Sequence, residues 1–161
     1  MKENGIYDKK SLRSVVGKTA DFGELAKDCV AFCNAEGGHI DIGIEDGETM
    51  PPAEQKIPDG LTTAIINRIS EKTVGVVLSA ETLIAGNGSE YIRLYIPRNP
   101  NAAAATTSGK FYLRIGDQSK PVGPHRQTYS QRRNNKGHAA CRPKLQCQAK
   151  TTYLSWTYCH A

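Results

Sequence analysis

The chain has 161 residues, of which 39% are hydrophobic and 23% are charged, a balance typical of a globular protein with an ordinary apolar core. It contains no run of about 18 apolar residues, which excludes a predicted membrane span. Residues 1–10 are polar and have no apolar segment of the secretory-signal type, so we expect a soluble, cytoplasmic protein with no membrane partner.

Charge divides the chain into two parts. Residues 1–120 have a net charge of −2, whereas residues 121–161 hold seven Lys or Arg, no acid, and a net charge of +7. Hydrophobic periodicity also ends near residue 122. We therefore predict a folded domain over residues 1–122 and a basic tail over residues 123–161 that is disordered or atypical. The tail is either a solvated end or a source of extra phosphate contacts.

The clearest predicted helix spans residues 21–35. Its apolar side chains recur at the spacing of one buried helical face, at Phe22, Leu25, Ala26, Cys29, Val30 and Cys33. Asp21 is a good N-cap, and Glu24 three residues later suggests a capping box. Gly37 and Gly38 end the helix. Without a secretory signal, we expect the two cysteines to be buried, reduced thiols.

A strand predicted over residues 39–45 follows the glycines, with Ile40, Ile42 and Ile44 on one face. Its end brings an acidic pair, Glu45 and Asp46. Taken alone, this pair and the following glycine are ordinary turn chemistry.

The next segment, residues 47–58, is a proline-punctuated loop. A second helix is predicted over residues 60–72, with Asp59 as its cap and Leu61, Ile65 and Ile69 on its buried face.

The remaining segments are rich in β-formers. They are a β-rich stretch over residues 74–84, a turn over 85–89, a strand over 90–96, a loop over 97–109 and a strand over 111–115. The order α, β, α, β, β, β predicts an α+β fold in which two main helices pack on a mixed sheet.

Alternation in the strand over 90–96 places Tyr91, Arg93 and Tyr95 on one face. That face is either a platform on which nucleic-acid bases stack or a half-exposed sheet face covered by another element. His39 and Asp41 also share a face, opposite Ile40 and Ile42, and we interpret them as a surface or covered pair.

Two longer segments, residues 31–47 and 109–121, together carry a family resemblance. They resemble the AlbA-like domain of the Schlafen family over about residues 3–122. The first matches a pattern of Asn-Thr-Glu-Gly-Gly followed by a strand and an acid. The second matches Tyr-x-Arg-x-Gly-x-x-Ser-x-x-Pro, at Tyr112, Arg114, Gly116, Ser119 and the nearby Pro121. The resemblance implies an α+β domain that binds DNA or RNA, of the transcriptional-regulator-like kind.

Basic residues at two places would then contact phosphates. They lie before the first helix and around the last strand, at Lys9, Lys10, Arg13, Lys18, Arg114 and Lys120. Such contacts give salt-dependent, largely sequence-independent affinity.

The resemblance also implies an enzymatic alternative, a metal-dependent endoribonuclease. Carried over position by position, its acidic triad becomes Glu3, Asp8 and Asp46, with Glu45 as a substitute for the last. Three such carboxylates could hold Mg²⁺ or Mn²⁺. The family's Glu-Phe-Lys element is degraded here to Asp8-Lys9-Lys10, which favours the binder over the enzyme.

A third alternative is an ATP-binding or nucleotide-binding regulatory module. Gly17-Lys18-Thr19 resembles the end of a phosphate-binding loop, but Leu12 stands where the loop's first glycine belongs. Because family members often pair or carry a second half-domain, the resemblance further implies a homodimer.

Overall fold

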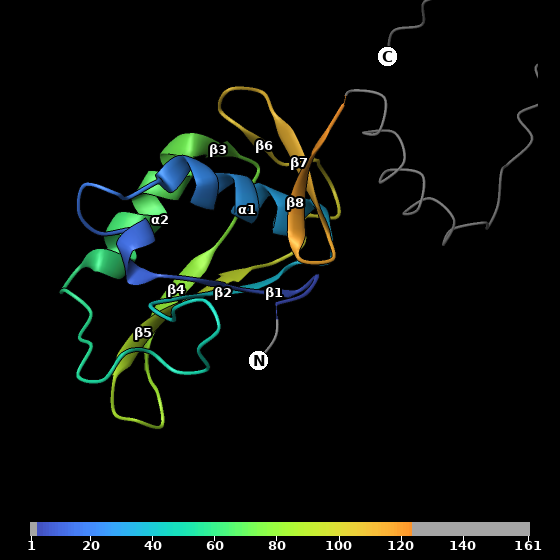
Figure 1. The fold of residues 1–161 in the computed structure, drawn as a ribbon. Helices are drawn as coiled ribbons and strands as arrows, with labels where there is room; N and C mark the ends of the chain where they lie inside the picture. The colour runs from blue at the N-terminus through green and yellow to red at the C-terminus, as the bar shows by residue number, and fades with distance from the viewer. Residues whose placement is uncertain (1–2, 124–161) are drawn as a thin grey trace, which may run out of the picture.

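The computed structural model describes residues 3–123 (Figure 1). Four strands form a mixed sheet in the order β1-β2-β5-β4. Their bounds are Tyr7–Lys10, Gly38–Ile42, Glu90–Ile96 and Ser79–Ile84 in that order. β1 pairs with β2 in parallel, and the other two pairings are antiparallel. The predicted α+β class is confirmed, whereas the basic tail lies outside the described residues from position 124 onward.

Two helices, α1 (Phe22–Asn34) and α2 (Leu61–Lys72), supply the helical layer. The core lies between them and the sheet, where β2 and β5 contribute alternate side chains that are fully buried, Ile40, Ile42, Ile92, Leu94 and Ile96. This is the pattern expected of strands with one face toward a core. Ile65 and Ile69 of α2 are also fully buried, as predicted.

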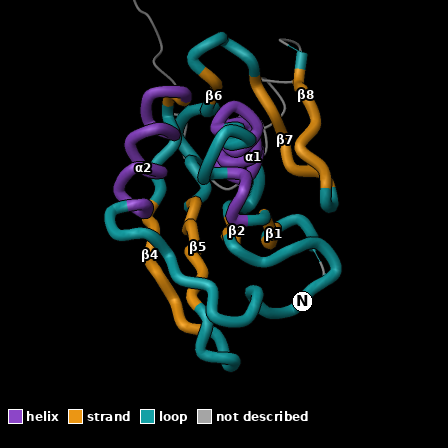
Figure 2. Tube along the Cα trace, turned by 60° about the vertical axis from the view of Figure 1, so that its left-hand side comes forward, coloured by secondary structure: helices purple, strands orange, loops and turns teal. Residues whose placement is uncertain are grey.

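A separate hairpin covers the side of α1 that faces away from the sheet. It consists of β7 (Phe111–Ile115) and β8 (Gln118–Val122). Figures 1 and 2 both show α1 between the hairpin and the sheet. α1 is therefore buried on two sides, and a charged residue, Asp28, is buried among its apolar ones.

Smaller elements tie these layers together. A 3-10 turn, η1 (Leu12–Ser14), joins β1 to α1, and β3 (Thr73–Val74) pairs with β6 (Ala105–Thr106). At the end of α1, the Asn34 amide nitrogen donates to the Ala104 and Tyr112 carbonyls, each at 2.9 Å. That side chain thus joins the helix to the β7 strand.

The predicted boundaries hold best for the strongly periodic segments. The strands over 90–96 and 111–115 are confirmed at both ends. The helices differ by one residue, and the strand predicted over 39–45 ends at Ile42 because Gly43, at φ 110°, turns the chain. Cys29 and Cys33 are buried free thiols, as predicted, and burial raises the pKa of each.

Three strands, β1, β6 and β8, escaped prediction, and a fourth, β3, overlaps the predicted β-rich stretch over residues 74–84 only at Val74. β1 is polar in three of its four positions, and β8 contains a proline, so neither has the apolar alternation of a strand. β3 and β6 have two residues each, and β6 lies inside the predicted loop over 97–109. All four take their strand geometry from their partners, because a polar or short segment carries little signal alone.

The helix caps follow the sequence only in part. The Asp21 carboxylate accepts from the Gly23 and Glu24 amides, as an N-cap should, but Glu24 does not complete a capping box: it pairs with Lys27. The Asp21 amide donates to Ser14 O instead. For α2 the predicted cap at Asp59 is wrong, because Gly60 occupies the cap position with left-handed backbone and no side-chain bond.

This contrast gives a test. We expect Asp21→Ala to lower the free energy of unfolding by about 1 kcal/mol, since two helix-end amides lose their acceptor. Asp59→Ala removes an acid at the equivalent end of α2 and should change stability by less than about 0.5 kcal/mol. Urea denaturation measures both, and equal effects would contradict this account of the caps.

None of the helices within residues 3–123 combines the length and the hydrophobicity needed to cross a membrane.

Candidate functional site: a charged cavity beside the first strand

An open cavity of about 620 Å³ lies beside β1, bounded by η1, the first turns of α1 and the β7–β8 hairpin. Most of its lining is charged. The cations are Lys9, Lys10, Arg13, Lys27, Arg114 and Lys120, and the acids are Glu3, Asp8, Glu24, Asp28, Glu45, Asp46 and Asp117. Residues from the two ends of the described chain thus meet on one surface.

The parallel register of β1 decides which side chains face this cavity. Asp8 pairs with Ile40 and Lys10 with Ile42, so both project on the core side of the sheet, toward α1. Lys9 also lines the cavity, but its ammonium donates to the Glu48 carbonyl at 2.7 Å. Because side chains alternate along a strand, Lys9 leaves β1 on the sheet face opposite to Asp8 and Lys10.

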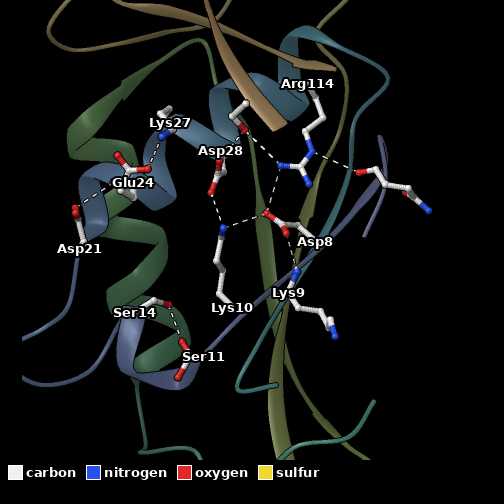
Figure 3. A network of polar contacts seen from close by, with 12 residues as sticks. Asp8, Lys9, Lys10, Ser11, Ser14, Asp21, Glu24, Lys27, Asp28 and Arg114 are labelled. Carbon is white, nitrogen blue, oxygen red and sulfur yellow. Dashed lines mark hydrogen bonds and ion pairs between the residues drawn. The ribbon is translucent and has the colours of Figure 1, made fainter. Parts of the chain in front are cut away.

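A closed ring of polar contacts stands at the cavity's inner end (Figure 3). Lys10 Nζ lies 3.2 Å from Asp8 Oδ2 and 3.1 Å from Asp28 Oδ2. Ser119 Oγ donates to Asp28 Oδ1 at 2.6 Å, and Arg114 Nη1 donates to both Ser119 Oγ and Asp8 Oδ2 at 3.4 Å. The ring joins β1, α1, β7 and β8.

Burial gives the members of this ring different roles. Asp8, Asp28 and Arg114 are 2%, 5% and 7% exposed, whereas a third of the Lys10 side chain reaches solvent. Burial alone would lower the pKa of Lys10, but the charges of Asp28 and Asp8 outweigh it and raise that pKa. Lys10 is therefore a firmly charged group facing the cavity.

Arg114 is held by more than its ion pair. Its guanidinium lies over the Phe32 ring, 4.7 Å from the ring centroid, and its Nε donates to the Asn4 carbonyl at 3.4 Å. Nη2 is buried and has no hydrogen-bond partner among residues 3–123. Arg114 therefore belongs to the buried inner end of the cavity lining, where it supports Asp8.

Exposed ion pairs form the outer wall. Arg13 Nη2 lies 3.0 Å from Glu45 Oε2, and Ser11 Oγ donates to Glu45 Oε1 at 2.7 Å. These bonds lower the pKa of Glu45. Lys27 pairs with Glu24 one turn along α1, and Lys120 is exposed on β8. Such exposed pairs open at little cost, so their cations are accessible to a ligand.

The three acids of the predicted triad line this same cavity, but in different environments. Asp8 is buried within the ring, Asp46 is exposed in the loop after β2, and Glu3 is half-buried near the N-terminus. Burial raises the pKa of Glu3, and the nearby charges of Asp8 and Asp46 raise it further.

These acids do not fit a metal ion in this arrangement. No three His, Cys, Asp or Glu side chains within residues 3–123 are grouped so that they could hold one. Lys10 and Arg114 also already bind the Asp8 oxygen that a metal would need. The role of Glu3, Asp8 and Asp46 as a catalytic triad stays a prediction.

Five of the six basic residues predicted to contact phosphate line the cavity, and Lys18 does not. Lys18 is exposed in the turn between η1 and α1. Lys27, Asp28 and Ser119 are among the lining residues that the sequence did not predict for the site. Ser119 belongs to the second resemblance motif, and Asp28 lies next to the buried apolar face of α1. Neither observation predicts that the Ser119 and Asp28 side chains are hydrogen-bonded to each other.

The opposite face of the sheet is organised around one ion pair. Arg93 donates to the two Asp41 oxygens through Nε and Nη2, each at 2.7 Å, and lies 5.7 Å from the Tyr91 ring centroid. Burial and the Arg93 charge lower the pKa of His39. Burial and Asp41 raise the pKa of Tyr7 to about 12. Asp41 is thus paired with Arg93, whereas the sequence had suggested His39 as its partner on this face.

No curated protein matches the chain. Among solved structures, the crystal structure of the DIP2311 protein from Corynebacterium diphtheriae superposes with a TM-score of 0.53 at 21% sequence identity. The match covers 80% of this chain and 24% of that one, so the chain spans about a quarter of its solved neighbour. At this identity the likeness concerns the fold alone.

A family model described as Schlafen, AlbA_2 matches residues 3–123, which includes β1, both resemblance segments and every residue that lines the cavity. The chain therefore belongs to the Schlafen AlbA_2 family.

Proposed function

We propose that this chain is a nucleic-acid-binding domain whose charged cavity receives the phosphate backbone. Membership in the Schlafen AlbA_2 family is consistent with a nucleic-acid-binding or a nuclease-like domain. One observation supports binding most directly. Basic residues predicted from separate segments, among them Lys10, Arg13 and Lys120, come from β1, η1 and β8 to line one cavity.

The acids of the cavity do not oppose this function as strongly as their number suggests. Four of the seven carboxylates are bonded to cations or to Ser119 within the cavity, namely Asp8, Glu24, Asp28 and Glu45. A phosphate oxygen can replace a carboxylate as the partner of an exposed lysine or arginine, with release of counterions from the nucleic acid. Binding should therefore weaken steeply as salt rises.

The test is a salt titration of binding. Fluorescence anisotropy with labelled single-stranded RNA, single-stranded DNA and duplex DNA shows which of these the chain binds. Replacing Arg13, Lys27 and Lys120 by alanine should reduce the slope of log K against log salt by about 2 to 3, because up to three phosphate contacts are lost.

A matched variant removes three cations away from the cavity, Lys56, Arg68 and Lys72. Its slope should stay near that of the unchanged chain. The comparison matters because residues 121–161 hold seven further cations. If the two triple variants bind alike, the cavity is not the binding surface and the proposal is wrong.

A further inference from the structure

We infer that Lys10 takes the place of a divalent cation in this cavity, so that the chain binds phosphate groups without metal. This inference rests on the proposed function and specifies how the same cavity works. Its starting point is the ring of contacts described above, in which the Lys10 ammonium bridges two buried carboxylates from different elements (Figure 3).

Asp8 and Asp28 lie on β1 and α1, and both are nearly inaccessible to water. Buried carboxylates need a cation and hydrogen bonds to offset the loss of hydration. A bound metal ion would supply the cation in a metal site. Here the Lys10 ammonium supplies it, at 3.2 and 3.1 Å from the two carboxylates.

The Lys10 ammonium has hydrogen-bond donor capacity for a ligand in the cavity. An ammonium has three N–H donors, and two carboxylates bind Lys10 among the described residues. Its side chain is one-third exposed on the cavity wall, whereas Arg114 on the other side of Asp8 is buried. Lys10 is thus the member of the ring that an entering phosphate oxygen meets, as it would meet a metal ion.

A metal ion at Asp8 would compete with the two cations that already bind this carboxylate. A divalent cation at Asp8 would lie next to the Lys10 and Arg114 charges, both within 3.4 Å of Oδ2. Like charges at such separations repel strongly in a poorly hydrated site. A metal could therefore enter only after Lys10 had moved away. The ring excludes metal while it keeps the carboxylates neutralised.

Two measurements on the unchanged chain test this directly. Nucleic-acid binding should persist in EDTA and should not strengthen when Mg²⁺ or Mn²⁺ is added at constant ionic strength, because the divalent ions only compete for phosphates. The electron paramagnetic resonance signal of free Mn²⁺ should not fall when the protein alone is added. Loss of binding in EDTA, or stoichiometric uptake of Mn²⁺ by the protein, would overturn the inference.

Variants of Lys10 extend the test. Lys10→Met should weaken nucleic-acid binding about 10-fold, the effect of losing one charge-assisted contact. It should also create Mn²⁺ uptake, since Asp8 and Asp28 would lack their shared cation. Lys10→Arg keeps the charge and should do neither. Unchanged Mn²⁺ uptake in Lys10→Met contradicts the competition between lysine and metal.

Lys10→Met leaves the ring with an uncompensated negative charge and can impair folding. Combining it with Asp28→Asn restores the charge balance. This double variant should bind nucleic acid as weakly as Lys10→Met and take up no Mn²⁺. Uptake there would overturn the inference. Because the Mn²⁺ measurements need no nucleic acid, a chain that binds no probe would refute the proposed function and leave the inference about Lys10 separately testable.

Discussion

Replacing Arg114 by leucine should lower the free energy of unfolding by about 3 kcal/mol, one of the two largest effects expected of a single substitution in this chain. The guanidinium is buried between Asp8, Ser119, the Asn4 carbonyl and the Phe32 ring. Its removal leaves the buried Asp8 carboxylate with Lys10 as its one remaining cation within residues 3–123. Equilibrium denaturation in urea measures the change.

A surface arginine provides the control for this prediction. Arg68 pairs with Glu71 on the exposed side of α2, so Arg68→Leu should change stability by less than about 0.5 kcal/mol. The double variant Arg114→Leu with Asp8→Asn should be less destabilised than the sum of the two single changes, because neither charge is then left unpaired. Equal losses for Arg114→Leu and Arg68→Leu would refute the structural role of the buried pair.

The second large effect is expected at Gly38, where α1 gives way to β2. Gly38 has φ 151°, and a Cβ there would lie 2.3 Å from the Ile6 carbonyl oxygen and 2.8 Å from Phe32 Cδ1. Backbone cannot move aside as a flexible side chain can. Gly38→Ala should therefore cost about 3 kcal/mol or more, since it adds overpacking to an unfavourable backbone conformation.

Gly88 separates these two contributions. It also has positive φ, 78°, but a Cβ there would meet nothing within 4 Å. Gly88→Ala should cost only the conformational part, about 1–2 kcal/mol. Thermal and urea denaturation of the two variants should differ by the steric cost at Gly38. If the two losses are the same, the close approach of the Ile6 carbonyl group to Gly38 is not what requires glycine there.

How far the sequence predicts this fold depends on how strongly each segment is patterned. β5 was predicted at both ends because Ile92, Leu94 and Ile96 alternate with polar residues against a core. β1 carries the cavity's central residues, but its sequence is mainly polar. It is a strand because β2 pairs with it along its whole length. Pairing of this kind lies outside any local pattern.

The candidate site, too, was predicted where residues carry a local motif and missed where they depend on distant partners. A motif resemblance identified Asp8 and Arg114, and the basic residues around the last strand included Lys120. The structure places all three on one cavity. What the sequence could not give is the partner of each charge. Asp28 is one of the two carboxylates that bind the Lys10 ammonium. In the sequence it is only one acid beside the apolar face of a helix. Only the packing of α1 under the hairpin brings it to the cavity.

The ring of contacts also has a consequence for the order of folding. It connects Asp8 to Arg114 across 106 positions of the chain, and Asp28 to Ser119 across 91. Contacts so distant in sequence form late, because a long loop must close before they give any stabilisation. During synthesis, Asp8 and Asp28 leave the ribosome long before Arg114 and Ser119. Before the hairpin emerges, the Lys10 ammonium can already pair with both carboxylates, whereas the Arg114 and Ser119 contacts must wait.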